Sequence, residues 1–300
     1  GRYDAAGVTL AAKAKGNDFT LSGEKMFVPD AHVADQLIVA TRTGGSGEEG
    51  ITLFLVDAKS PGVTITQLKT VDMTRRQCHI AFQDVAVARA QVLGEVGKGW
   101  SILRRVLDQA MAGLSAEMVG TGQKALDMAV SYAKERVQFG KPIGSFQAVK
   151  HKCVDMMVQV ENARSLTYYA AWTVDENVAE AKQAVPMAKA YCSDMGKTVT
   201  SEAIQVHGGI GFTWDHDCHL FLKRARLDEV LFGSATLHME RAAERVDCGT
   251  QRFSLVEGEN LRAGVAAERV GLRRPVKIPG GGREPVDVML GAVVVGEHLR

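Results

Sequence analysis

The feature that most limits how this chain can fold is one change in hydrophobic period, near residue 98. Before it, apolar and polar residues alternate in short segments (19–22, 36–41, 51–56, 63–65 and 78–82) between Gly, Pro and Asn turn signals. After it, apolar residues recur every three or four positions, as in the series Phe146, Val149, Cys153, Met156 and Val160. Period two is typical of antiparallel strands, and a 3–4 period is typical of amphipathic helices. The sequence therefore predicts strands first and helices afterwards.

Residues 1–92 are expected to form a small antiparallel β-barrel or sandwich. The segments suggest five or six strands with no helix between them, and such an arrangement buries its apolar face only by closing or by packing sheet on sheet. The chain starts at Gly1 and begins at once with strand and turn material. We therefore expect this β-domain to be incomplete at its N-terminus.

Residues 95–247 are expected to form an antiparallel helical bundle. One helix should start at about residue 98, a second should follow the 146–174 series and a third should run over 179–207, with short helices near 219–227 and 234–246. Pro186 should kink the third helix or mark a late start, and Gly208 should end it. The fold class predicted is thus α+β. Residues 249–300 match neither pattern and are expected to be a poorly ordered extension.

Composition excludes several classes of partner. Lys and Arg number 36 against 35 Asp and Glu, a formal net charge of +1, which gives no reason to expect nucleic acid as a partner. No apolar run approaches the roughly 20 residues of a membrane span, and no signal segment opens the chain. Its 5 cysteines are an odd number and lie far apart. These features favour a cytoplasmic protein without a disulfide framework.

Two further segments resemble ligand sites at first inspection. His216, Cys218 and His219 lie within four positions, but no second pair of ligands follows nearby, so we expect no metal site. The glycines of the G-G-I-G segment at 208–211 follow a helix, so they form neither a dinucleotide fingerprint nor a P-loop. Three glycines in four residues nevertheless let a flat or phosphorylated ligand approach the backbone closely.

Four phrases together resemble the acyl-CoA dehydrogenase family. They are G-E-K-M-F at 23–27, R-V-Q-F-G-K-P-I at 136–143 with F-Q at 146–147, and Q-V-H-G-G-I-G-F at 205–212. Their order and spacing match the family over residues 1–247. The resemblance implies a β-domain followed by a four-helix bundle. It also suggests that this chain corresponds to the last two-thirds of such a protein, without the family's N-terminal helical domain.

The resemblance implies that FAD binds between subunits. Arg136 and Phe139 would reach the cofactor of a neighbouring subunit, with the planar Arg136 guanidinium on the pyrophosphate. Taken alone, Arg136 is better explained as a surface cation at a helix C-terminus, and the motifs taken together favour the cofactor. The positions that would hold the adenosine and pyrophosphate from the other side are Gln205, Gly208 and Gly209.

The flavin itself would be contacted from other segments. Phe27 and Val28 fall where the family places an aromatic-x-Thr contact, and Pro29 replaces the hydroxyl residue there, which removes one hydrogen bond. Ser234 matches a cofactor-contacting threonine of the family. The same resemblance implies an acyl-CoA substrate, an electron-transfer flavoprotein as electron acceptor, and a homo- or hetero-oligomer.

In the family's reaction a carboxylate removes the α-proton of an acyl-CoA thioester, and the β-hydrogen leaves as hydride to flavin N5. The product is a trans-2-enoyl-CoA. Because the α-proton is weakly acidic, hydrogen bonds to the thioester carbonyl must stabilise the developing enolate, and burial must raise the pKa of the base. The reaction therefore needs a carboxylate within reach of the α-carbon.

The usual base lies in a Tyr-Glu-Gly-Thr phrase, and here Phe232 occupies its position within L-F-G-S at 231–234. The alternative position on the first bundle helix holds Ala110 and Met111. The catalytic residue is therefore unassigned, although the Phe232 backbone N–H remains able to polarise a thioester carbonyl. Other carboxylates near these positions, each expected to be a solvated helix or cap residue, are Asp108, Glu117, Asp228 and Glu229. Asp108 and Glu117 are the two to test first.

Three hypotheses remain open. The chain is part of a flavoprotein dehydrogenase whose base is an unrecognised carboxylate, or it is the non-catalytic partner in a mixed oligomer in which a sister subunit carries the glutamate. Paired subunits of that kind occur in the family. The third hypothesis is a helical interaction module without a cofactor, which the helical seams alone would allow.

Overall fold

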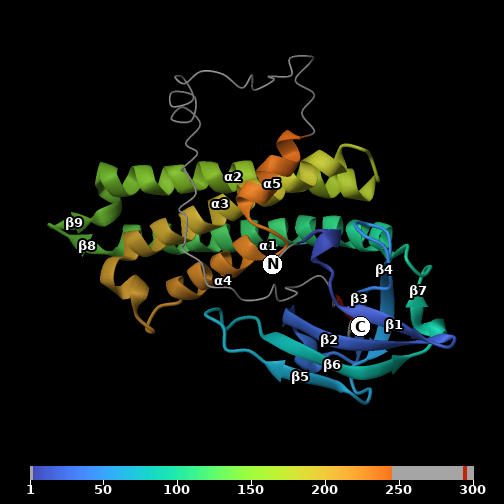
Figure 1. The fold of residues 1–300 in the computed structure, drawn as a ribbon. Helices are drawn as coiled ribbons and strands as arrows, with labels where there is room; N and C mark the ends of the chain where they lie inside the picture. Colours follow the sequence, from blue (N-terminus) through green and yellow to red (C-terminus); the bar gives the residue numbers. More distant parts are fainter. Residues whose placement is uncertain (1–2, 245–292, 296–300) are drawn as a thin grey trace, which may run out of the picture. The chain divides into compact units, whose positions relative to one another are not determined.

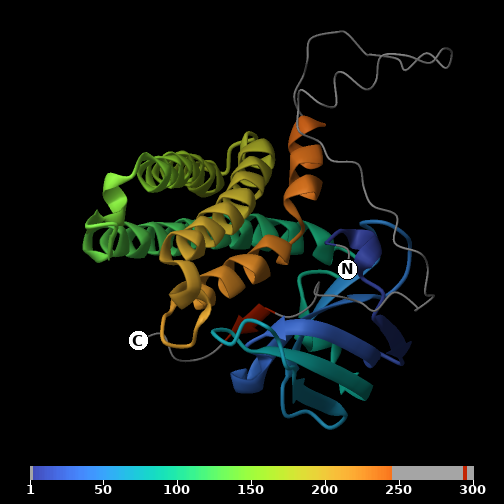
Figure 2. The ribbon, with the colours of Figure 1, turned by 90° about the vertical axis from the view of Figure 1, so that its left-hand side faces the viewer.

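The computed structural model describes residues 3–244 and 293–295, in which the alternating segments form strands and the 3–4 repeats form helices (Figure 1). The predicted α+β fold, strands first and a bundle afterwards, is confirmed. Figure 2 shows the same separation of strands and helices from a direction turned by 90°. Apart from residues 293–295, the expected extension at 249–300 lies outside the described residues.

The strand region forms one open sheet with the order β5-β6-β2-β1-β3-β4-β7, and neighbours are antiparallel except β1 and β3, which meet in parallel at Ala11 and Arg42. β10 (Val293–Val295) pairs antiparallel with β3. The described strands do not close into a barrel, so the sandwich-like alternative is the correct one. The strands are β1 (Ala11–Lys15), β2 (Asp18–Pro29), β3 (Gln36–Arg42), β4 (Ile51–Asp57), β5 (Val63–Gln67), β6 (Gln77–Val87) and β7 (Val92–Leu93).

Strand β2 shows how period two builds the core of this sheet. Phe19 and Leu21 face inward with the polar Thr20 between them, and Phe19 meets Phe54 of β4 edge to face at 5.0 Å between ring centroids. The pairing register with β6 shifts between Lys25 and Val28, where Phe27 has a φ of 57°. This irregularity has the form of a β-bulge, which re-aims side chains and is common beside binding sites.

The helices begin with α1 (Gly99–Glu135), whose first turn packs against β4. Trp100 and Leu103 join Ile51 and Leu53 in a shared core, and a Cβ at Gly99 would come within 2.9 Å of the Leu53 side chain. A glycine there lets the helix start close to the strand. The other helices are α2 (Gln147–Asp175), α3 (Ala181–His207), α4 (Cys218–Val230) and α5 (Ala235–Ala243).

Short elements connect the long ones. The two-residue strands β8 (Val137–Gln138) and β9 (Lys141–Pro142) form a hairpin between α1 and α2. The 3-10 turns are η1 (Ala5–Gly7), η2 (Ala31–Val33), η3 (Arg89–Gln91), η4 (Ile143–Ser145) and η5 (Gly208–Phe212). α3 contains Pro186 in its second turn and ends, as expected, at Gly208, which has a φ of 65°.

The predicted seam of α2 is buried against its neighbours, because Met156, Val160 and Ala163 pack into the bundle core with residues of α1 and α3. The opposite face is exposed and carries Tyr168 and Trp172. None of the described helices is long and apolar enough to cross a membrane.

Candidate functional site

A cavity of about 460 Å³ lies where α1, α3 and the loop between α4 and α5 meet. It brings together Asp108 and Met111 of α1 with Phe232 of the loop, so positions far apart in sequence share one wall. We call it the Phe232 pocket. Its lining also includes Tyr3, Arg104, Lys182 and Arg241, none of which the sequence singled out.

The loop that carries Phe232 has an unusual backbone. Phe232 has a φ of 60° and Gly233 a φ of 112°, and a Cβ at Gly233 would come within 2.7 Å of Leu237 Cδ2 and 3.0 Å of His238 Nε2. Only glycine fits there. Ser234 caps α5, since its Oγ accepts a hydrogen bond from Leu237 N–H at 3.3 Å.

Two features of Phe232 bear on the chemistry of the pocket. Its ring meets Tyr3 edge to face, with 6.2 Å between centroids. Its backbone N–H donates to the Tyr3 hydroxyl, a contact that lowers the pKa of Tyr3 against the larger rise that burial causes. Tyr3 also lines the pocket, so a carbonyl oxygen that enters there would take the place of its hydroxyl as the acceptor of this N–H.

The four candidate carboxylates have different environments. Asp108 is half-buried and lines the Phe232 pocket. Glu117 does not line it, because its carboxylate pairs with Arg224 and lies 4.0 Å from Arg75. Glu229 pairs at 3.2 Å with Arg226.

Asp228 corrects the expectation of a solvated residue. It is 0% exposed and lies 3.1 Å from Arg224 Nε. Burial raises the pKa of Asp228 to about 7, and the Arg224 guanidinium counteracts part of that rise. The sequence predicted that Asp228 lies on an exposed face of its helix, but in the structure this position is buried.

The hairpin between α1 and α2 presents Phe139 to solvent. Phe139 and Gly140 have φ values of 54° and 76°, as a tight two-residue turn between antiparallel strands requires. The Phe139 ring is 90% exposed. Arg136, which ends α1, is also exposed and keeps its backbone bond to Tyr132 O at 2.8 Å.

The end of α3 lies at the same end of the bundle, because Tyr132 of α1 stacks on His207 of α3 with ring centroids 4.6 Å apart. Gln205, Gly208 and Gly209 are exposed there. A Cβ on either glycine would meet nothing within 4 Å. In Figure 1 the β8–β9 hairpin marks this end of the bundle, and none of these residues lines the Phe232 pocket.

Phe27 and Val28 lie at the bulge of β2. Phe27 is 38% exposed, whereas Val28 is 1% exposed and its side chain belongs to the core of the sheet. Any contact that Val28 makes with a ligand must therefore come from its backbone. The roles assigned to both residues from the sequence stay predictions.

The histidine and cysteine cluster differs from the one that the sequence suggested. His207, His216 and Cys218 have donor atoms within 4.8 Å of one another, and His219 instead packs on Trp214. The ring nitrogens have other partners: His207 Nδ1 donates to Ala203 O at 2.7 Å, and His216 Nδ1 accepts from Cys218 N–H at 3.3 Å. Burial raises the pKa of the Cys218 thiol to about 11. The expected absence of a metal stays a prediction.

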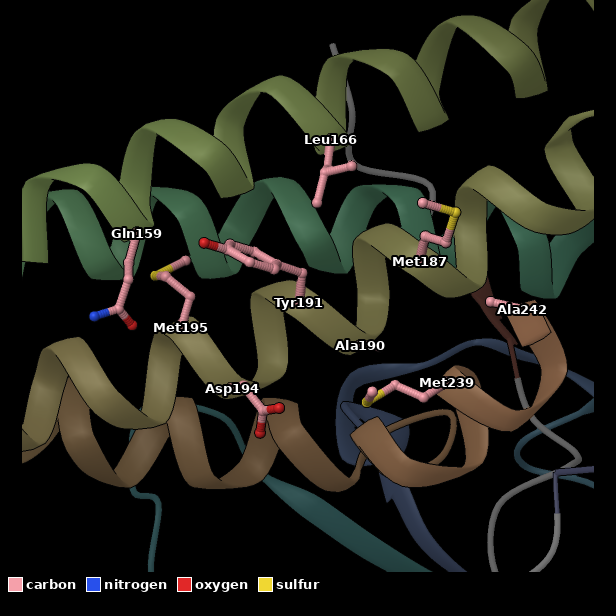
Figure 3. A pocket seen from close by; sticks show the side chains of 9 residues that line it. All are labelled: Gln159, Leu166, Met187, Ala190, Tyr191, Asp194, Met195, Met239 and Ala242. Atoms are coloured by element: carbon pink, nitrogen blue, oxygen red, sulfur yellow. The ribbon is translucent and has the colours of Figure 1, made fainter. Parts of the chain in front are cut away.

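A second hollow, of about 430 Å³, lies between α2, α3 and α5 (Figure 3). Its lining is mostly apolar, with Leu166, Met187 and Met239 among its walls. Its carboxylate, Asp194, pairs with Lys197 at 3.1 Å. Nothing in its lining combines a carboxylate with a strained loop, so the Phe232 pocket is the better candidate for chemistry.

Two family models match the chain. The middle domain of acyl-CoA dehydrogenases matches residues 1–85, and the C-terminal domain of acyl-CoA dehydrogenases matches residues 97–246. The chain belongs to the acyl-CoA dehydrogenase family. Proteins of this family are flavoproteins that bind FAD.

Curated relatives of this acyl-CoA dehydrogenase-family chain include the short-chain specific acyl-CoA dehydrogenase of Megasphaera elsdenii, 37% identical over 77% of this chain and 61% of that protein. The caffeyl-CoA reductase–Etf complex subunit CarC of Acetobacterium woodii is 36% identical, over 73% of this chain and 60% of that protein. This chain thus spans less than two-thirds of the length of these relatives.

Solved structures of the family have the same fold. Butyryl-CoA dehydrogenase from Megasphaera elsdenii superposes with a TM-score of 0.77 at 33% identity, over 81% of this chain and 64% of that one. Glutaryl-CoA dehydrogenase in complex with glutaryl-CoA gives 0.76 at 29% identity, over 79% of this chain and 60% of that one.

The residues at the end of the bundle fit a dinucleotide. Arg136 offers a guanidinium for a pyrophosphate, Phe139 an exposed aromatic face, and Gly208 and Gly209 a backbone with open space where a Cβ would project. The family's cofactor is therefore compatible with what this chain presents.

Proposed function

We propose that this chain is part of an FAD-dependent acyl-CoA dehydrogenase that oxidises an acyl-CoA thioester to a 2-enoyl-CoA. The observation that carries the proposal is the Phe232 pocket, in which the family's base position and Asp108 share one cavity. A carboxylate is the group that the reaction needs in that place. The relatives with this fold include acyl-CoA dehydrogenases for short-chain and for short or branched-chain substrates.

Two groups of the pocket have separate roles in the proposed reaction. Asp108 accepts the α-proton, and the electron pair of that C–H bond becomes the new double bond. The Phe232 N–H donates to the thioester carbonyl and stabilises the negative charge that develops there. FAD, when bound, would supply the acceptor for the β-hydrogen, which leaves as hydride.

Two protomers are needed to hold the cofactor. The exposed residues at the bundle end do not line the Phe232 pocket of their own chain. We assign them to the cofactor of a neighbouring protomer, and Phe27, the Val28 backbone and Ser234 to the cofactor of their own. An electron-transfer flavoprotein is the proposed electron acceptor, since one relative is named as a subunit of an Etf complex. A cytoplasmic location is proposed with it.

The experiment that tests this function uses the full-length protein with butyryl-CoA and an artificial electron-accepting dye. The wild type should be yellow and should reduce the dye. Asp108→Asn should lower kcat by about 100-fold or more, because it removes the proton acceptor. Glu117→Gln should retain more than about a tenth of kcat, since a carboxylate paired with Arg224 takes no part in proton transfer. The reverse order of effects would move the base to Glu117.

A second function is favoured by Phe232 itself, because a phenyl ring accepts no proton. In that case the chain is the non-catalytic partner in a mixed oligomer and contributes packing and FAD contacts to a glutamate-bearing sister subunit. The lone subunit would then bind flavin and show no bleaching with butyryl-CoA. Bleaching of the flavin in the lone subunit would refute this alternative.

A further inference from the structure

Two successive peptide carbonyls of the Phe232 loop, defined as residues 231–234, accept hydrogen bonds from buried side chains. Lys189 Nζ of α3 donates to Gly233 O at 3.2 Å, and His238 Nε2 of α5 donates to Phe232 O at 2.9 Å. Both donors are 0% exposed. Neither lines the Phe232 pocket. They can therefore act on the pocket only through the loop.

Lys189 has a complete set of acceptors. Besides Gly233 O, its ammonium donates to Ser193 Oγ at 2.8 Å and to Glu229 O at 3.2 Å, so each of its three protons has a partner. A buried ammonium carries a large desolvation cost, which an apolar side chain of similar size would avoid. What the ammonium adds is a fixed position for the carbonyl groups that it binds.

The loop needs such support because its backbone is strained. A φ of 60° at Phe232 places a bulky residue in the left-handed region. Conformations of this kind carry backbone strain and persist where the surroundings over-determine them. Lys189 and His238 hold two successive carbonyls on the buried side of the loop, which supplies that constraint.

We propose that Lys189 and His238 are positioning residues that hold the Phe232 loop so that the Phe232 N–H can bind the carbonyl of an acyl thioester. The identity of the ligand, an acyl thioester, rests on the proposed function. The positioning role rests only on the hydrogen bonds that the two side chains make to the loop. The side chains that do the positioning lie behind the loop, on the side away from the pocket lining.

The first test needs no ligand and measures amide hydrogen exchange of the loop by mass spectrometry. Lys189→Met and His238→Leu should each speed exchange in residues 231–234 by about tenfold or more, the equivalent of one lost hydrogen bond. His238→Gln keeps an N–H donor at the Nε2 position and should restore slow exchange. Lys197→Met on the same helix, a lysine with a solvent-accessible side chain, should leave the loop unchanged.

The second test uses [1-¹³C]crotonyl-CoA as the probe and isotope-edited infrared spectroscopy of the bound thioester. In the wild type the carbonyl band should lie below its position in water, because a hydrogen bond from the Phe232 N–H weakens the C=O bond. In Lys189→Met and His238→Leu the band should return toward its aqueous position. In His238→Gln and Lys197→Met the band should stay shifted, a pattern that general destabilisation would not produce.

The outcomes separate the two proposals. Slow exchange of the loop in both Lys189→Met and His238→Leu would overturn the positioning role, whatever the activity. A shifted band that depends on both residues, in a protein that does not turn over butyryl-CoA, would refute the dehydrogenase activity and support the positioning. Faster exchange in both variants, with no crotonyl-CoA bound to the wild type, would refute the acyl-thioester assignment only. If Lys189→Met does not fold, the His238→Leu and His238→Gln pair decides.

Discussion

His238 shows how burial sets the charge state of one side chain. Its Nδ1 has no hydrogen-bond partner among the described residues, and its Nε2 donates to the Phe232 carbonyl. Burial lowers the pKa of His238 to about 4, and the neighbouring Lys189 ammonium lowers it further. An unfolded histidine titrates near 6.5. Between about pH 6.5 and pH 4 the histidine binds a proton in the unfolded chain but stays neutral in the native state. The free energy of unfolding therefore falls as the pH is lowered through this range.

The pH dependence of stability should therefore change when His238 is replaced. Between pH 7.5 and pH 5 the wild type should lose about 2 kcal/mol more of its free energy of unfolding than His238→Gln, which does not titrate. Asp228, with its pKa raised to about 7, acts in the opposite direction over this range, but it is present in both proteins and cancels in the comparison. Urea unfolding at the two pH values measures the difference, and an equal loss in both proteins would contradict it.

At the scale of elements, the hairpin between α1 and α2 and the end of α3 act as one unit. The stack of Tyr132 on His207 holds the two helix ends together, and the exposed residues beyond them are free of the bundle core. A change to those exposed side chains should therefore affect ligand binding and not folding. The sequence motifs at 136–143 and 205–212 therefore lie at the same end of the bundle.

Arg136→Ala should weaken FAD retention by about tenfold or more, because it removes charge-assisted hydrogen bonds to a pyrophosphate. The thermal midpoint should change little, since the Arg136 side chain is exposed. The ratio of flavin to protein absorbance after gel filtration measures retention. Lys134→Ala, two residues earlier at the same end of α1 and also exposed, is the matched control. Equal flavin occupancy in wild type and Arg136→Ala would remove the cofactor assignment.

At the scale of the whole described molecule, Arg224 of α4 joins three parts of the chain. Its guanidinium lies 3.5 Å from Asp72, in the segment between β5 and β6, and also pairs with Glu117 of α1 and Asp228 of α4. The side chains of Asp72 and Asp228 are 2% and 0% exposed. One cation thus compensates two buried carboxylates and a half-buried one.

Arg224→Leu should lower the free energy of unfolding by about 3–5 kcal/mol, because it leaves buried carboxylates without a counter-charge. Arg226→Leu, two positions away and 55% exposed, removes a surface ion pair with Glu229 and should cost less than about 1 kcal/mol. Urea unfolding of both variants at pH 8, where the Asp228 carboxylate is ionised, measures the difference. Similar losses in the two variants would show that the buried cluster does not need Arg224.

Most of the elements follow from the sequence. The alternating segments became β2 to β6 and the 3–4 repeats became the long helices, because main-chain hydrogen bonding fixes these two periods. β1 was missed, since A-A-K-A-K at 11–15 has no strong apolar alternation, and β7, β8 and β9 are too short to show a period. The sequence did not decide whether the strands close into a barrel, because the pattern of a single strand does not determine which other strands it pairs with.

Some features of the candidate site could likewise be predicted from the sequence, and others could not. The sequence by itself determined the order of strands and helices and the two nucleotide-type motifs, because backbone periodicity and local residue patterns need only neighbours along the chain. Only the tertiary structure decided that Asp108 lines the Phe232 pocket, that Glu117 is held by Arg224, and that Lys189 and His238 grip the Phe232 loop. Burial and pairing depend on which distant segments pack together, and a single sequence does not contain those distances.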